Sequence, residues 1–280
     1  MTDGQRQHDA LDDVFDDVLI ENTAQTVYKR LAEIEHKRLA IQSRWVWELI
    51  QNARDASTGS NGLHVRVNLR PEELIFQHNG APFRDREIAH LILHGTTKQA
   101  TGGVGRFGTG FITTHLISRH IRVRGKLVDD RCFDFDLNRD GANADELRVA
   151  MRASREEFRA SIDRQVAEVA LPFTTEFRYP LNEHTLDVVK SGMDSLRTCV
   201  PYLLAFNPAL TSVSIDDDGT VTTWTKSPAT PLVSGIVAIE VTDTTSTPGS
   251  TVIIAGDTDV QVAMLIHGYP QAVSYPGNVP

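Results

Sequence analysis

Three polar residues, Glu48, Asn52 and Asp55, are spaced so that they could act together in the segment Trp45–Ser57. At about 100° per residue they fall within an arc of roughly 60° on a helix. The opposite side of that helix is apolar and would pack on a core, with Val46, Leu49, Ile50, Ala53 and Ala56. A carboxylate can orient water, and an amide oxygen is a hard ligand that suits Mg²⁺. Glu48, Asn52 and Asp55, called the polar ladder below, predict a site for a metal ion and phosphate. An ordinary amphipathic helix with a polar stripe is the alternative.

A glycine-rich segment further along the chain supplies the second chemical signal. Five of the nine residues from 102 to 110 are glycine, whereas the whole chain has 19 in 280, so fewer than one is expected there. Apolar residues follow at helical spacing, from Phe111 to Ile117. Free backbone N–H groups at the start of a helix form a cradle for phosphate. Together, the ladder and the glycine segment predict a nucleotide site.

These two stretches resemble motifs of one family. ELIQNARDA, residues 48–56, resembles the N-box of the GHKL ATPases, and GRFGTGF, residues 105–111, resembles their second glycine box as heat-shock chaperones and sacsin-like proteins carry it. The resemblance covers about residues 20–220. It implies the Bergerat fold, an α/β (α+β) sandwich with a mixed, mostly antiparallel sheet and helices packed on one face.

The resemblance also implies a reaction, the Mg²⁺-dependent hydrolysis of ATP to ADP and phosphate. Glu48 would orient or deprotonate the attacking water, Asn52 would hold the Mg²⁺, and Asp55 would line the nucleotide pocket. The phosphates would be cradled by the glycine segment, with Gly103, Gly105, Arg106, Phe107, Gly108, Thr109, Gly110 and Phe111.

Two further phosphate contacts follow from the resemblance. The polar stretch 94–101 corresponds to a lid, from which Thr97 and Lys98 could reach phosphate oxygens; a flexible solvated loop is the alternative. A threonine at the start of a later strand contacts phosphate in the family. Thr175 fits best and Thr174 is the other candidate, although β-propensity explains both threonines as well.

The stretch QHNGAPF, residues 77–83, departs from the family pattern. The family has Asp-x-Gly-x-Gly there, and its Asp accepts a hydrogen bond from the adenine amino group. This chain has His78 at the Asp position, Gly80 at the first glycine and Pro82 at the second. A neutral imidazole can accept one hydrogen bond, and the Asn79 amide could contribute another. A tight turn with no role in binding is the alternative.

Other motifs fit less well. Gly103-x-Gly105-x-x-Gly108 matches the dinucleotide fingerprint, but the polar KQATG before it is not the apolar strand which that site needs. No GxxxxGK[ST] occurs, which excludes a P-loop. His90 and His94 have zinc-helix spacing, but no Glu follows His90. A histidine kinase would need a phosphoacceptor helix, and His36 matches one poorly.

Composition sets the broad class. The 280 residues are 40% hydrophobic and 23% charged, as in soluble globular proteins, and no apolar run approaches the length of a membrane helix. The acidic N-terminus is not a signal peptide, and Cys132 and Cys199 are far apart, which favours a cytoplasmic protein with reduced thiols. A net charge of −9 argues against coating nucleic acid. The basic strip from Arg119 to Lys126 predicts a solvated strand face, with a nucleic-acid or partner contact as the alternative.

The chain divides into two expected modules. Residues 1–225 would form the ATP-binding domain, with residues 1–21 as an acidic amphipathic arm whose helix, 9–21, packs on its own domain or exchanges with a partner. A second helix is expected from Ala24 to Ile41, and residues 151–170 are interpreted as a strand edge and an insertion. Residues 226–280 would begin an incomplete β-rich module with strands at 236–241, 251–255 and 260–266.

The predicted function is therefore a conformational switch within a larger protein, driven by slow ATP hydrolysis. Its expected partners are ATP and ADP, a second copy in a nucleotide-dependent homodimer, and a protein client or downstream domain. The alternative is a nucleotide-gated binding module that hydrolyses little or no ATP by itself.

Overall fold

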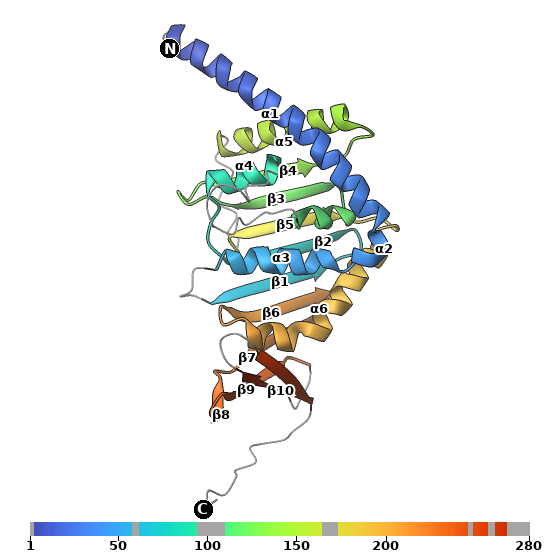
Figure 1. Cartoon of the computed structure of the whole chain (residues 1–280), viewed down its shortest axis with the longest axis vertical. Coiled ribbons are helices and arrows are strands. Elements are labelled where there is room, and N and C mark those ends of the chain that lie inside the picture. Colours follow the sequence, from blue (N-terminus) through green and yellow to red (C-terminus); the bar gives the residue numbers. More distant parts are fainter. Residues whose placement is uncertain are drawn as a thin grey trace, which may run out of the picture.

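The computed structural model describes residues 3–57, 62–93, 110–163, 173–245, 249–256 and 261–267, with side chains from residue 18 onward. The chain builds one mixed sheet with helices on one side (Figure 1), which confirms the expected fold class. The helices are α1 (Asp3–His36), α2 (Arg38–Ile41), α3 (Arg44–Asp55), α4 (Asp85–Leu93), the short 3-10 helix η1 (Phe111–Leu116), α5 (Ala144–Asp163) and α6 (Leu186–Phe206). None of these described helices combines the length and apolar character needed to cross a membrane.

The sheet has eleven strands in the order β11-β10-β9-β7-β6-β1-β2-β5-β3-β4, with β8 paired to β9. β1 and β6 run parallel, and the other described neighbours run antiparallel. The strands are β1 (Leu63–Leu69), β2 (Glu73–His78), β3 (His120–Lys126), β4 (Cys132–Asn138), β5 (Thr175–Pro180), β6 (Leu210–Asp217), β7 (Thr220–Lys226), β8 (Thr230–Val233), β9 (Ile236–Asp243), β10 (Ser250–Gly256) and β11 (Gln261–His267).

α3 lies on the helical side of the sheet with its apolar face buried, as its periodicity predicts. Its core-facing residues are at most 3% exposed: Val46, Leu49, Ile50, Ala53 and Ala56. Trp45 anchors the start of the helix, because its Nε1 donates to the carbonyl of Val188 in α6 at 3.0 Å. A Cβ at Gly192 would lie 2.3 Å from the Trp45 ring, so glycine is needed where α6 crosses α3. This packing fixes the orientation of the polar ladder.

α1 is one helix, which corrects the expected break between a helix at 9–21 and another from residue 24. Asn22 and Thr23 are weak helix formers, but an apolar stripe continues past them. Ile20, Ala24, Val27 and Leu31 are each at most 4% exposed and pack on the core. Burial of this stripe outweighs the local propensity. Figure 1 shows the N-terminal half of α1 extending beyond the sheet.

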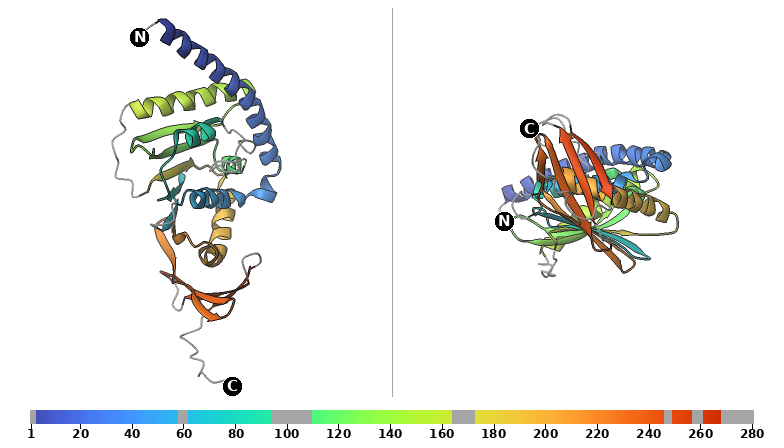
Figure 2. Two further views of the ribbon diagram at one scale, coloured as in Figure 1. Left: turned by 60° about the vertical axis from the view of Figure 1, so that its left-hand side comes forward. Right: turned by 90° about the horizontal axis from the view of Figure 1, so that it is seen from below.

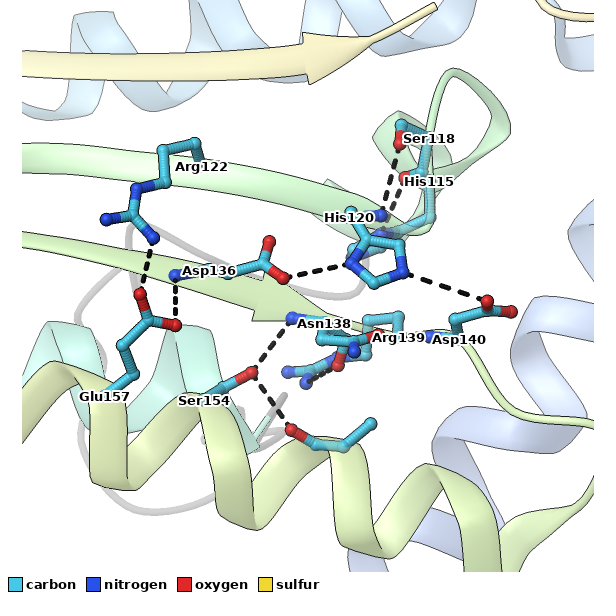
Figure 3. A network of polar contacts seen from close by, with 11 residues as sticks. His115, Ser118, His120, Arg122, Asp136, Asn138, Arg139, Asp140, Ser154 and Glu157 are labelled. Atoms are coloured by element: carbon cyan, nitrogen blue, oxygen red, sulfur yellow. Dashed lines mark hydrogen bonds and ion pairs between the residues drawn. The ribbon is translucent and has the colours of Figure 1, made fainter. Parts of the chain in front are cut away.

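α5 covers the edge of the sheet at β4. The sequence interpretation of residues 151–170 as a strand edge and an insertion is wrong for residues 151–163, which lie in α5, and residues 164–170 lie outside the described residues. Leu147 and Met151 are fully buried. Side chains of α5 accept hydrogen bonds from the outward-facing N–H groups of β4, as Figure 3 shows for two of the three pairs. These pairs are Asn138 N to Ser154 Oγ at 2.9 Å, Asp136 N to Glu157 Oε2 at 3.1 Å, and Asp134 N to Ser161 Oγ at 3.3 Å. The helix therefore satisfies an edge that would otherwise be open to another strand.

The C-terminal strands extend the same sheet. β9 pairs with β7 through Trp224 and Asp243, and β10 and β11 follow beyond it. The structure confirms the three strands expected after residue 230 and adds β8, which the sequence did not indicate. Figure 2 shows these strands continuing past α6, whose buried face rests on this end of the sheet.

Candidate functional site

The Glu48 carboxylate lies directly against Gly110, the one residue of the glycine segment 102–110 that the structure describes. A Cβ at Gly110 would fall 1.9 Å from Glu48 Oε2 and 2.3 Å from Oε1. The Glu48 side chain is 15% exposed, and its Oε1 accepts a hydrogen bond from Arg44 Nε at 3.1 Å. α3 therefore presents its first ladder residue to the end of the glycine segment.

The next residue of the ladder, Asn52, is buried. It is 7% exposed, and no hydrogen bond from its Nδ2 is found within the described part of the chain. A buried polar group without a partner is uncommon and calls for an explanation. A half-turn of the amide would place the oxygen there, and an oxygen is what Mg²⁺ requires. The environment of Asn52 thus fits a metal ligand.

Asp55 completes the ladder at the C-terminal end of α3. Its side chain is 15% exposed, and Oδ1 lies 3.3 Å from Arg54 Nη2. Glu48, Asn52 and Asp55 are therefore all shielded from open solvent. An ordinary polar stripe on a surface helix would be exposed, so the low exposure of this ladder sets it apart from such a stripe.

The turn after β2, which carries His78 and Gly80, docks on the C-terminal end of α3. Ala81 N donates to the Ala56 carbonyl at 2.6 Å. A Cβ at Gly80 would lie 2.8 Å from the Ala56 Cβ, so the close approach requires glycine. His78 is 3% exposed, and its Nδ1 accepts a hydrogen bond from Gly80 N at 3.1 Å. Nδ1 therefore forms a hydrogen bond within the turn, and it could accept a hydrogen bond from a ligand only if the bond to Gly80 opened.

Asn79 has a structural use of its own. Its Oδ1 accepts from His64 N at 2.7 Å, and its Nδ2 donates to the Gly62 carbonyl at 3.1 Å. Both ends of the amide thus hold the turn against the start of β1. A contact between Asn79 and a ligand would compete with these two bonds.

The two candidate threonines have different environments. Thr174 Oγ1 donates to the turn carbonyl of Gly80 at 2.5 Å, with the His78 carbonyl at 3.2 Å. Thr175 pairs with His78 across β2 and β5, is 0% exposed, and its Oγ1 has no partner in the described ranges. Thr174 therefore fastens the turn, and Thr175 keeps an unused hydroxyl beside it.

The rest of the predicted phosphate site lies outside the described residues, including Thr97, Lys98, Gly103, Gly105, Arg106, Phe107, Gly108 and Thr109. Phe111 follows Gly110 and is 1% exposed, with its ring 5.5 Å from that of Phe177. It begins η1, a six-residue 3-10 helix, where the sequence indicated the N-terminus of a helix of regular spacing.

Arg44 is a residue that the sequence interpretation missed. The spacing could have shown it, because Arg44 and Glu48 are four positions apart and face the same side of a helix.

The basic side chains of β3 form ion pairs with acidic residues of the sheet. Arg122 pairs with Asp134 at 2.6 Å, and Arg124 pairs with Glu176 at 3.1 Å. Acidic neighbours on the sheet thus compensate these charges.

The geometry places the Glu48 carboxylate against Gly110, docks the turn at Gly80 on Ala56 at the end of α3, and pairs His78 with Thr175 across β2 and β5. The candidate site residues supply two carboxylates, an amide and a hydroxyl, a donor set that suits a metal-bound phosphate better than a hydrophobic ligand. No protein-family model matches this chain, and no curated protein matches it.

Proposed function

We propose that this protein binds ATP with Mg²⁺ and hydrolyses it slowly, in the manner of the GHKL ATPases that its motifs resemble. The contact between the Glu48 carboxylate and Gly110 carries this proposal. It sets a group that can activate water at the end of the glycine-rich segment 102–110, which would bind phosphate in this proposal. The Glu48 carboxylate, for acid–base chemistry, and the glycine segment, for phosphate binding, would then lie next to each other.

Each residue of the site has a role in this proposal. Glu48 orients the attacking water and accepts its proton. Asn52 holds Mg²⁺, which neutralises phosphate charge when bound. The Thr175 hydroxyl and the N–H groups of the glycine segment bind phosphate oxygens, and Asp55 lines the pocket beside the turn. His78 contacts the base, with adenine as the expected base.

A nucleotide-gated binding module with little hydrolysis is a second candidate, and the Arg44–Glu48 ion pair favours it. The pair, at 3.1 Å, takes up one acceptor site of the carboxylate that would otherwise be open to water. ATP binding would then change dimerisation, or contact with a client or a downstream domain, without chemical turnover.

Phosphate release by the full chain separates these candidates. Glu48→Ala should bind ATP as the wild type does but release phosphate about 10²- to 10⁴-fold more slowly, the range for a lost general base. The exposed Glu183→Ala is the matched control and should change neither quantity. Equal turnover in Glu48→Ala and the wild type would remove Glu48 from the mechanism. Tight ATP binding without turnover in the wild type would favour the binding module.

A further inference from the structure

The two ends of the sheet differ in how their edges are protected. At β4 the outward N–H groups of Asp134, Asp136 and Asn138 are bonded by side chains of α5. At the other end, β11 pairs with β10 on its inner side. The described residues supply no hydrogen bond to its outer side. A row of unpaired N–H and C=O groups is a template for another strand.

β11 also lacks the usual features that keep an edge strand from pairing. Its sequence, QVAMLIH, contains no proline and no Lys, Arg, Asp or Glu. Val262 is 67% exposed and Met264 is 58% exposed. On the opposite face, Leu265 lies across from the buried Val252 in β10. Exposed edges of natural sheets are usually protected by charged residues or proline. The edge at β11 lacks both, so it is suited to pairing with another strand.

We propose that β11 is an interface between two copies of this chain, formed by antiparallel pairing of β11 with β11 of the second copy. The strand is complementary to itself about its midpoint. With Met264 opposite Met264, Val262 lies opposite Ile266, and all three are on the outer face. One patch then meets the same patch across a two-fold axis, as in most dimers.

The absence of charge on β11 lets a second copy approach at this place. The chain carries a net charge of −9, so two copies repel over much of their surface. Like charges directly opposite one another destabilise a strand pair. β11 brings no charged side chain to the pairing, so the copies can approach along it without that penalty. The interface does not involve the proposed ATP site and requires no nucleotide.

Analytical ultracentrifugation of the full 280-residue chain without nucleotide tests the proposal. The wild type should sediment as a dimer at micromolar concentration. Met264→Lys should sediment as a monomer, because it places two ammonium groups opposite each other at the two-fold axis. Val262→Lys should also sediment as a monomer, because it places an ammonium group against the apolar Ile266 of the second copy. Val149→Lys is the matched control, since Val149 is 61% exposed on α5 at the opposite end of the sheet, and it should remain dimeric. Circular dichroism of each variant checks that it is folded.

A disulfide cross-link tests which residues of the two β11 strands lie opposite each other. In a chain with Cys132→Ser and Cys199→Ser, Met264→Cys should form a disulfide-linked dimer on mild oxidation, because directly opposite Cβ atoms lie about 4.5–5.5 Å apart. Val221→Cys, exposed on β7, should not. A wild type that stays monomeric, or a dimer that survives both lysine variants, overturns the proposal. The proposal would also be overturned if a chain ending at His267 dimerises and the full chain does not. That result would mean that residues 268–280 block the edge of β11.

Discussion

The carboxylate of Glu48 and the α-carbon of Gly110 are in such close contact that a methyl group at position 110 would lie 1.9 Å from Oε2. α3 carries Glu48, and Gly110 ends the glycine segment, so this contact joins two parts of the chain that the sequence keeps far apart. The absence of a side chain at residue 110 therefore sets where the Glu48 carboxylate can be.

Gly110→Ala should displace the Glu48 carboxylate while leaving the fold intact. The clash involves the end of a flexible side chain, which can rotate away, so the melting temperature should change little. Turnover should fall by roughly 10²-fold, the effect of a misplacement of about 1 Å in a reacting group. Phosphate release and thermal melting measure the two quantities. Unchanged turnover, with a normal melting curve, would mean that the position of Glu48 does not matter.

Arg44→Ala should free Oε1 of Glu48 to accept a hydrogen bond from water. Arg44 is 58% exposed, so the ion pair is screened and contributes about 0.3–0.5 kcal/mol. Turnover should therefore rise by roughly two-fold, with ATP affinity unchanged. Arg131→Ala is a control, because Arg131 pairs with Asp129 at 2.7 Å away from α3. Slower turnover in Arg44→Ala would show instead that Arg44 supports catalysis.

The charge of Asp216 should make the free energy of unfolding depend on pH in the acid range. Hydrogen bonds from Arg70 at 2.8 and 2.6 Å, helped by Gly219 N–H, lower its pKa to about 2, although burial opposes the shift. Because the folded-state pKa is below the usual 3.8, this stabilisation is present above about pH 4 and is lost as the pH falls towards 2. Solvent around Arg70 screens the pair, so we expect about 1 kcal/mol.

Urea unfolding of Asp216→Asn against the wild type measures this contribution. The variant should be less stable at neutral pH, and the difference should shrink between about pH 4 and pH 2. Asp194→Asn is the control, because Asp194 is a 75% exposed carboxylate, and it should show little difference at either pH. A difference that stays constant with pH would mean that the Asp216 charge is not what stabilises the fold.

The sequence predicted the parts of the fold that carry regular periodicity. The apolar face of α3 is buried as predicted, and β9, β10 and β11 lie over the strands expected at 236–241, 251–255 and 260–266. α5 could not be predicted in the same way, because its segment is rich in charge. Its role depends on Ser154, Glu157 and Ser161 meeting the edge of β4, which is a tertiary contact. β8 was missed because Pro231 argues against a strand.

The candidate site shows a similar division. Helical spacing places Glu48, Asn52 and Asp55 on one side of α3. Spacing could not show that Asn52 would be buried with no partner for its Nδ2 among the described residues, nor that Thr174 and Asn79 would form hydrogen bonds with the turn. Those facts depend on how the turn docks on the end of α3. Thr175 shares its buried face of β5 with Phe177 and Tyr179, since residues two apart in a strand lie on one face.

Isothermal titration of the full chain with ATP, with and without Mg²⁺, tests the central claim most directly when wild type and Asn52→Ala are compared. The wild type should bind ATP more tightly with Mg²⁺ than without it, and Asn52→Ala should lose that dependence on the metal. A wild type that does not bind ATP under either condition would contradict the nucleotide site. Identical Mg²⁺-dependent affinity in both proteins would contradict the role assigned to Asn52.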